Sequence, residues 1–156
     1  MSDKIEEIVN FLQLSDELAT AGQPTRSQYS AIATAGYSVV INLALLDAPD
    51  AVADEAALAR NLGIEYLQIP VEWTAPTLTD FQAFRSAMDA RSKDKIFVHC
   101  VANKRVSAFV YLYHVYQGVD EIIARQDLAK IWTPNAIWQT FIDRVRSRMS
   151  EDCGKI

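Results

Sequence analysis

A chain of 156 residues, of which 50% are hydrophobic and 22% charged, has the size and composition of one globular domain. Its formal net charge of −5 argues against a nucleic-acid-binding surface, and its two cysteines are too few for a disulfide framework. No apolar run reaches the roughly 18 residues of a membrane span, and the N-terminus lacks the apolar region of a signal peptide. We therefore expect a single cytoplasmic domain over residues 1–156, unless a signal peptide has been removed, with neither a nucleic acid nor a membrane as partner.

Local patterns predict helices and strands that alternate along the chain. An apolar stripe at helical spacing predicts an N-terminal helix within residues 1–14. Its members are Ile5, Ile8, Val9 and Leu12. Short apolar or β-branched runs predict strands at 18–20, 37–43, 64–69 and 96–98. Capping residues and apolar stripes predict further helices that begin near residues 25, 50, 77, 105, 119 and 133. The polar segment 150–156, which contains Cys153, is expected to be a flexible tail.

This alternation predicts an α/β fold with a central, mostly parallel sheet of four to five strands and helices on both faces. In such sheets ligands bind beyond the carboxyl ends of the strands. The loops 42–46, 70–76 and 100–105 each follow a predicted strand. We therefore expect the functional site where these three loops meet.

The stretch from His99 to Ser107 carries the most distinctive chemistry. It reads His-Cys-Val-Ala-Asn-Lys-Arg-Val-Ser, and it joins the strand at 96–98 to a long apolar helix. A cysteine attacks only as the thiolate, and Arg105 together with the helix N-terminus would stabilise that charge. The amides of residues 101–105 can converge on one point, and a planar guanidinium suits phosphate oxygens. These residues predict an anion-binding site with Cys100 as its nucleophile.

Packing offers a plainer interpretation of the same residues. Cysteine is among the most buried residue types, so Cys100 at a strand end could simply fill the core. Arg105 at a helix start could face solvent. The residues alone leave both interpretations open.

Three further segments are distinctive alongside the Cys100 loop: Ala21-Gly22-Gln23-Pro24-Thr25, Val40-Ile41-Asn42-Leu43, and residues 69–77. With the loop, they resemble the cysteine-dependent protein tyrosine phosphatase superfamily, in its dual-specificity-like branch. They are similar in particular to the bacterial phosphatase-like domain family of beta-lactamase-hydrolase-like proteins. The resemblance implies a protein tyrosine phosphatase-like fold and hydrolysis of a phosphomonoester through a Cys100 thiophosphate intermediate. The substrate would be a phosphorylated small molecule or a phosphoprotein.

The resemblance also assigns phosphate or sulfate binding to the loop, through Val101, Ala102, Asn103, Lys104 and Arg105. Here the chain departs from the superfamily pattern in three ways. Four residues, instead of five, separate Cys100 from Arg105. The usual loop glycine is absent, and Asn103 is its nearest substitute because Asn tolerates left-handed backbone. Val106 also displaces the expected hydroxyl residue to Ser107.

A phosphatase needs an acid that protonates the leaving oxygen. In the relatives this acid follows the third strand, and Glu72 is the only ionisable residue in the matching loop 70–76. We therefore expect Glu72 to be the acid, with Asp80 second, although helix capping suits Asp80 better. Trp73 beside it could form a wall or lid over an aryl substrate, or fill the core.

His99, Ser107 and Asn42 are expected to support the Cys100 loop through hydrogen bonds. His99 would bond the backbone and orient the loop, as the resemblance implies, and no second ligand at metal spacing accompanies it. Asn42 interrupts an apolar strand, and buried Asn needs partners, which we expect around Cys100. Ser107 would share a hydrogen bond with the Cys100 thiolate. We expect no metal and no cofactor.

Two alternatives to a phosphatase stay open. The shortened loop is compatible with a non-catalytic module that binds phosphate or another anion. An activated Cys100 thiolate is also compatible with a sulfurtransferase or redox enzyme.

Overall fold

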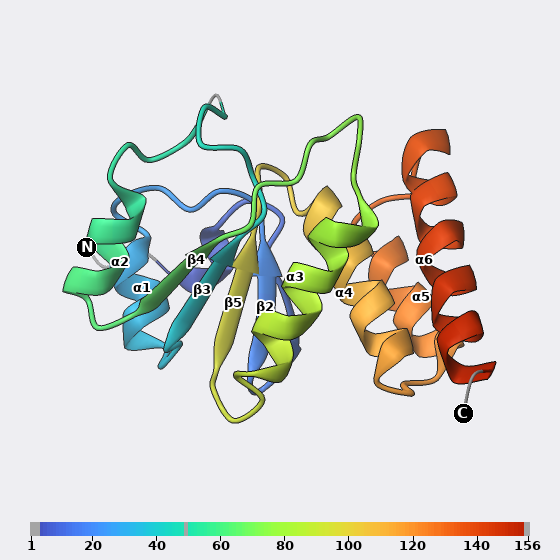
Figure 1. The fold of residues 1–156 in the computed structure, drawn as a ribbon. Coiled ribbons are helices and arrows are strands. Elements are labelled where there is room, and N and C mark those ends of the chain that lie inside the picture. The colour runs from blue at the N-terminus through green and yellow to red at the C-terminus, as the bar shows by residue number, and fades with distance from the viewer. Residues whose placement is uncertain (1–3, 49, 155–156) are drawn as a thin grey trace.

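The computed structural model describes residues 4–48 and 50–154, with side chains described through residue 150. Its elements, in chain order, are η1 (Ile5–Glu7), β1 (Leu12–Ser15), β2 (Leu18–Ala21), α1 (Tyr29–Thr34), β3 (Val39–Asn42), α2 (Glu55–Asn61), β4 (Glu65–Gln68), α3 (Leu78–Asp89), β5 (Ile96–His99), α4 (Lys104–Tyr116), α5 (Glu121–Ala129) and α6 (Ala136–Gly154). Figure 1 shows a central sheet with helices on both sides. The predicted α/β class is confirmed.

The sheet has five strands in the order β1-β2-β5-β3-β4. β1 is antiparallel to β2, and the other neighbours are parallel. At its carboxyl end, His99 of β5 pairs with Ala21 of β2 and with Asn42 of β3. Because these three strands end at the same level, the loops that follow them meet at one edge of the sheet.

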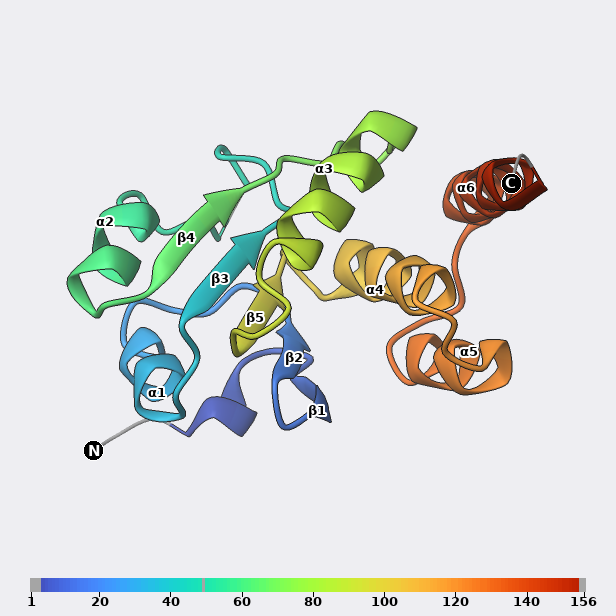
Figure 2. The ribbon, with the colours of Figure 1, turned by 60° about the horizontal axis from the view of Figure 1, so that its bottom comes forward.

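Alternate strand residues face opposite sides of the sheet and build two cores. On one side Val40 and Phe97 pack with residues of α1 and α2. On the other side Ile41 and Val98 pack with residues of α3, α4 and α6. Figures 1 and 2 show α4 next to the sheet, with α5 and α6 farther out. Within the described residues, no helix is both long and apolar enough to cross a bilayer.

Both chain ends differ from the prediction. The predicted helix within 1–14 is the short 3-10 turn η1 followed by strand β1. Leu12 and Leu14 are half-buried whereas Gln13 and Ser15 are exposed, so a period of two, not the helical period, governs this segment. The tail predicted from residue 150 is helical as far as Gly154, and residues 155–156 lie outside the described part.

Helix boundaries also shift locally. The helix expected near residue 50 begins at Glu55, and the last helix begins at Ala136 instead of at Pro134. The Asn135 side chain accepts a hydrogen bond from the Trp138 amide at 3.0 Å, so Asn135 caps α6. The capping box predicted for α3 is present between Thr77 and Asp80.

Candidate active site

The loop between β5 and α4 forms one wall of a pocket of about 220 Å³. The pocket is lined by Trp73, Cys100, Val101, Ala102, Lys104 and Arg105. Cys100 directly follows β5 and is only 1% exposed. The structure therefore brings the predicted nucleophile and the predicted arginine to the same pocket, at the carboxyl end of the central strand.

Contacts with the N-terminal segment hold this loop in place. Gly22 forms an isolated antiparallel bridge with Ala102, and the Gln23 amide donates to the Val101 carbonyl at 3.0 Å. The Asn10 side chain donates to the Ala102 carbonyl at 2.9 Å. Hydrogen bonds thus hold the loop against the segment before β1 and the segment after β2.

Asn103 sits at the tightest point of the loop. Its φ of 67° lies in the left-handed region, as expected for the residue that replaces the superfamily glycine. Its side chain is fully buried and donates to the Asn10 carbonyl at 2.8 Å and to Thr20 Oγ1 at 3.0 Å. The amide side chain therefore adds two anchors that a glycine could not supply.

Arg105 is buried and is held by the loop that follows β4. Its Nη1 donates to the Val71 carbonyl at 2.8 Å, and its guanidinium carbon lies 6.0 Å from the centre of the Trp73 ring. Glu72 lies between these two contacts in the sequence, and its side chain is exposed. The plainer interpretation, in which Arg105 faces solvent, is therefore wrong.

Trp73 is partly packed against other aromatic rings and partly exposed. It packs against Trp132 at 5.4 Å and Trp138 at 5.8 Å between ring centres, and the Trp138 indole donates to the Trp73 carbonyl at 2.8 Å. At the same time 37% of Trp73 is exposed, and it lines the pocket. Lys104 Nζ lies 5.6 Å from the centre of the Trp132 ring. The pocket thus has an aromatic wall and two cations.

A buried polar cluster lies behind the loop. His99 Nδ1 lies 3.2 Å from the Cys100 carbonyl oxygen, and His99 Nε2 lies 2.6 Å from Glu55 Oε2. Glu55 also accepts hydrogen bonds from the Tyr29 hydroxyl and from Gln23 Nε2. Burial raises the pKa of Glu55, but the bonds from His99, Tyr29 and Gln23 outweigh burial and hold that pKa below its usual range.

Sequence reasoning missed Glu55 as a member of this cluster. A local signal was present, because Glu55 stands four residues before Ala59, a small apolar residue on the same face of the predicted helix. That face is buried in the structure, at Glu55 and at Ala59. Gln23 Nε2 bonds both the Pro24 carbonyl and Glu55.

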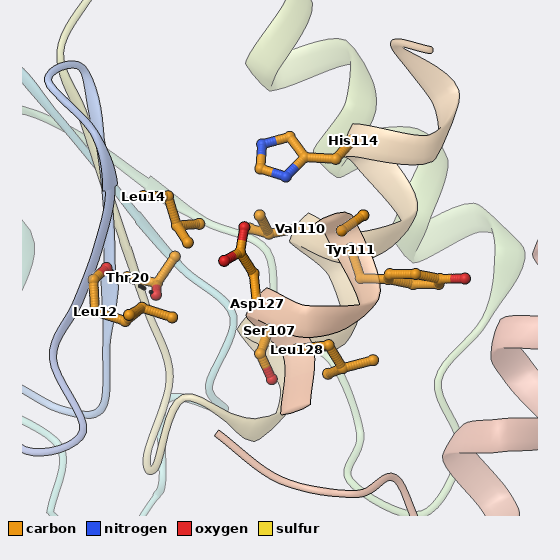
Figure 3. Close-up of a pocket in the computed structure, with 10 residues that line it drawn as sticks. Leu12, Leu14, Thr20, Ser107, Val110, Tyr111, His114, Asp127 and Leu128 are labelled. Carbon is orange, nitrogen blue, oxygen red and sulfur yellow. Dashed lines mark hydrogen bonds between the residues drawn. The ribbon is translucent and has the colours of Figure 1, made fainter. Parts of the chain in front are cut away.

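Ser107 and Asn42 form hydrogen bonds with partners other than those expected. The Ser107 hydroxyl donates to the Lys104 carbonyl at 3.0 Å, and Ser107 lines a separate cavity of about 10 Å³ between β1–β2 and α4–α5 (Figure 3). The shift by one residue carries this hydroxyl away from Cys100. Asn42 accepts from the Ala44 amide at 2.9 Å and donates to the Tyr66 hydroxyl at 3.0 Å. It therefore shapes the loop after β3, not the Cys100 loop.

Asp80, the second candidate for the acid, has a structural role. Asp80 is engaged in the capping box of α3, where it accepts from the Thr77 amide at 3.0 Å. Among residues 4–48 and 50–150, no three His, Cys, Asp or Glu side chains gather in the manner of a metal site.

Comparison with known proteins shows the family of this chain. The family model PTP-NADK, "DSP-PTPase phosphatase fused to NAD+ Kinase", matches residues 6–142. The beta-lactamase hydrolase-like protein of Xylella fastidiosa is 32% identical over 114 residues, which cover 70% of this chain and 26% of that protein. The chain thus spans about a quarter of the length of this relative.

Solved structures share the fold. A DUF442 protein from Shewanella putrefaciens CN-32 is 34% identical, with a TM-score of 0.84, and the match covers 93% of this chain and 96% of that one. TpbA of P. aeruginosa, in complex with pTyr, is 14% identical with a TM-score of 0.70, covering 96% of this chain and 94% of that one. At that identity the second match shows the fold alone.

Proposed function

Because the chain belongs to the PTP-NADK family of DSP-PTPase phosphatases, we propose that it hydrolyses a phosphomonoester through a thiophosphate on Cys100. One observation carries the proposal: Cys100 and the buried Arg105 line the same pocket, with the loop residues between them on its wall. The first-turn amides of α4, which begins at Lys104, have no acceptor within the helix and are available to an anion. Phosphate oxygens would therefore bind the loop amides and the Arg105 guanidinium.

The reaction has two steps. The Cys100 thiolate attacks phosphorus, the P–O bond to the leaving group breaks, and the departing oxygen takes a proton from Glu72. Water then gives a proton to the Glu72 carboxylate as it attacks phosphorus, which releases inorganic phosphate and the thiolate. Arg105 and the amides stabilise the charge on the equatorial oxygens in both transition states.

The surroundings of Glu72 support its role as the acid. The residue before it, Val71, accepts a hydrogen bond from Arg105, and the residue after it, Trp73, lines the pocket. Glu72 thus stands between two residues that contact the site, and its side chain is exposed, although Glu72 is not among the six residues that line the pocket.

Turnover of an aryl phosphate by the purified protein between pH 5 and 7 tests the proposal. Cys100→Ser is expected to abolish turnover, and Arg105→Lys to lower kcat/KM about a hundredfold because the planar fork is lost. Glu72→Gln is expected to lower kcat by about 10²-fold or more, with a smaller effect on substrates whose leaving group needs no proton. Cys153→Ser is the matched thiol control. Full activity in Cys100→Ser would overturn the proposal.

A non-catalytic anion-binding module is the second candidate. The observation that favours it is the loop of four residues between Cys100 and Arg105, one fewer than the superfamily uses. In that case phosphate or vanadate would raise the melting temperature without any turnover. The rise would be lost in Arg105→Ala and retained in Cys100→Ser.

A further inference from the structure

The buried cluster of Gln23, Tyr29, Glu55 and His99 has no part in the reaction described above. None of its members is among the six residues that line the 220 Å³ pocket. They come from four segments, the loop after β2, α1, α2 and β5, and converge directly behind the nucleophile. His99 is 0% exposed and Glu55 is 5% exposed, so the cluster is closed to bulk solvent. A buried carboxylate is costly unless it serves as a partner to another charge.

Both ring nitrogens of His99 lie within hydrogen-bond distance of an oxygen. Its Nδ1 lies 3.2 Å from the Cys100 carbonyl oxygen, which can only accept. Its Nε2 lies 2.6 Å from a Glu55 oxygen that already accepts from the Tyr29 hydroxyl. A neutral imidazole has one N–H and would leave one of these two acceptors facing a bare nitrogen. A doubly protonated ring donates to both.

We propose that Glu55 is a positioning residue that keeps His99 doubly protonated at neutral pH, so that the Nδ1–H stays bonded to the Cys100 carbonyl. The carboxylate contacts Nε2, whereas the Cys100 carbonyl lies at Nδ1, on the other side of the ring. The ion pair therefore directs its positive end toward the Cys100 loop. Stabilisation of a Cys100 thiolate by this positive charge rests on the proposed function, whereas the protonation of His99 does not.

The neighbouring titratable groups are compatible with this charge pair. Burial and the Glu55 charge raise the pKa of Tyr29 far above its usual range, and they raise the pKa of Tyr66 to about 12. Both phenols are therefore neutral at pH 7. The Arg60 charge acts on Tyr66 from α2, and it partly opposes this rise.

Nitrogen NMR of histidine-labelled protein tests the inference directly. The chain has two histidines, His99 and His114, and His114→Gln assigns the signals. Burial lowers the pKa of His114, so its ring serves as a neutral reference at pH 7. We expect both ring nitrogens of His99 to be protonated at pH 7, above the value near 6.5 at which an unperturbed histidine loses its proton. A bare nitrogen on His99 in the wild-type protein at pH 7 would overturn the proposal, with no variant required.

Glu55→Gln then isolates the role of the carboxylate. We expect its His99 to carry one ring proton at pH 7, and Cys100 to be alkylated by iodoacetamide about tenfold more slowly at pH 7 than in the wild-type protein. Glu65→Gln is the matched control, because Glu65 is an exposed carboxylate on β4 that pairs with Arg91. It should leave both readouts unchanged. An unchanged His99 signal in a folded Glu55→Gln protein would contradict the proposal. Neither readout needs a substrate, so a lack of turnover would count against the proposed function alone.

Discussion

Gly22 lies against the Val101 carbonyl so closely that a β-carbon at Gly22 would overlap this oxygen and stand 2.6 Å from Val9 Cγ1. At the same place the Gln23 amide donates to Val101, and the Gly22 amide donates to the Val9 carbonyl at 2.7 Å. The missing side chain lets the segment after β2 lie flat on the Cys100 loop. The shape of the Cys100 loop thus depends on a residue that does not line the pocket.

Gly22→Ala is therefore expected to displace the Cys100 loop. The obstructing atom is a backbone oxygen that cannot swing aside, so we expect a loss of about 1–3 kcal/mol in the free energy of unfolding. Phosphate should also protect Cys100 less well from alkylation. Urea unfolding and alkylation rates with and without phosphate measure the two effects. Gly118→Ala is the control: its φ of 87° is strained for alanine, but the space around it is open and distant contacts are untouched. It should lose stability while phosphate protection stays normal.

Substitutions at Asn103 separate backbone strain from side-chain anchoring. Asn103→Gly keeps the left-handed backbone and loses the bonds to Asn10 and Thr20, so we expect destabilisation by about 1–2 kcal/mol. Asn103→Ala loses the same bonds and adds the left-handed penalty of about 1–2 kcal/mol. Equal urea midpoints for the two variants would show that the left-handed geometry does not govern this position.

The sequence predicted the parts of the molecule that depend on local pattern. The apolar runs at 37–43 and 96–98 lie within or beside β3 and β5, and the loops after them meet as expected because parallel strands end together. Asn103 was identified as the stand-in for a glycine because few other residues accept its backbone angle. By contrast, the four apolar residues at the N-terminus fit a helical stripe although residues 12–15 pair as a strand. In such a short run the helical period and the strand period cannot be told apart from sequence. Pairing with β2 makes this segment a strand.

The local sequence pattern could not predict the hydrogen-bond partners of buried polar groups. Asn42 was expected to face the Cys100 loop, but it bonds Ala44 and Tyr66. The register of β3 with β4 pairs Asn42 with Gln68, and Tyr66, two residues earlier on β4, lies on the same face of the sheet. The Glu55 cluster joins residues 23 to 99, and no spacing along the chain encodes that meeting. The sequence could single out polar residues such as Asn42 and His99, whereas their hydrogen-bond partners depend on tertiary packing.

Trp73 is expected to act on substrate binding more than on chemistry. Its ring lines the pocket, and Trp73→Ala removes that wall while the backbone carbonyl that accepts from Trp138 remains. We expect KM for an aryl phosphate to rise about 3- to 10-fold, the equivalent of one aromatic contact of roughly 0.5–1.5 kcal/mol. A small alkyl phosphate serves as the internal control, since it has no ring to stack. An equal loss for both substrates would instead indicate that Trp73 positions Arg105.

Acid stability should depend on Glu55. A carboxyl group whose pKa is lower in the folded than in the unfolded chain stabilises the fold above its unfolded pKa, and loses that contribution as the pH falls through the folded value. The bonds from His99, Tyr29 and Gln23 lower the pKa of Glu55 in the fold, against the effect of burial. The free energy of unfolding of the wild-type protein should therefore fall as the pH drops below about 4.5, the ordinary pKa of a glutamate side chain.

Two variants test this dependence by urea unfolding between pH 3 and 7. Glu55→Gln should flatten the curve in the acid range, because the group that titrates is gone. Glu55→Leu should be less stable than wild type at pH 7 by about 3–5 kcal/mol, since it leaves His99, Tyr29 and Gln23 buried without their acceptor. Glu65 also has a pKa lowered by its hydrogen bond to Arg91, but it is half exposed and solvent screens the pair. Glu65→Gln should accordingly change the acid limb far less than Glu55→Gln, and equal changes in the two would contradict the assignment of acid sensitivity to the buried cluster.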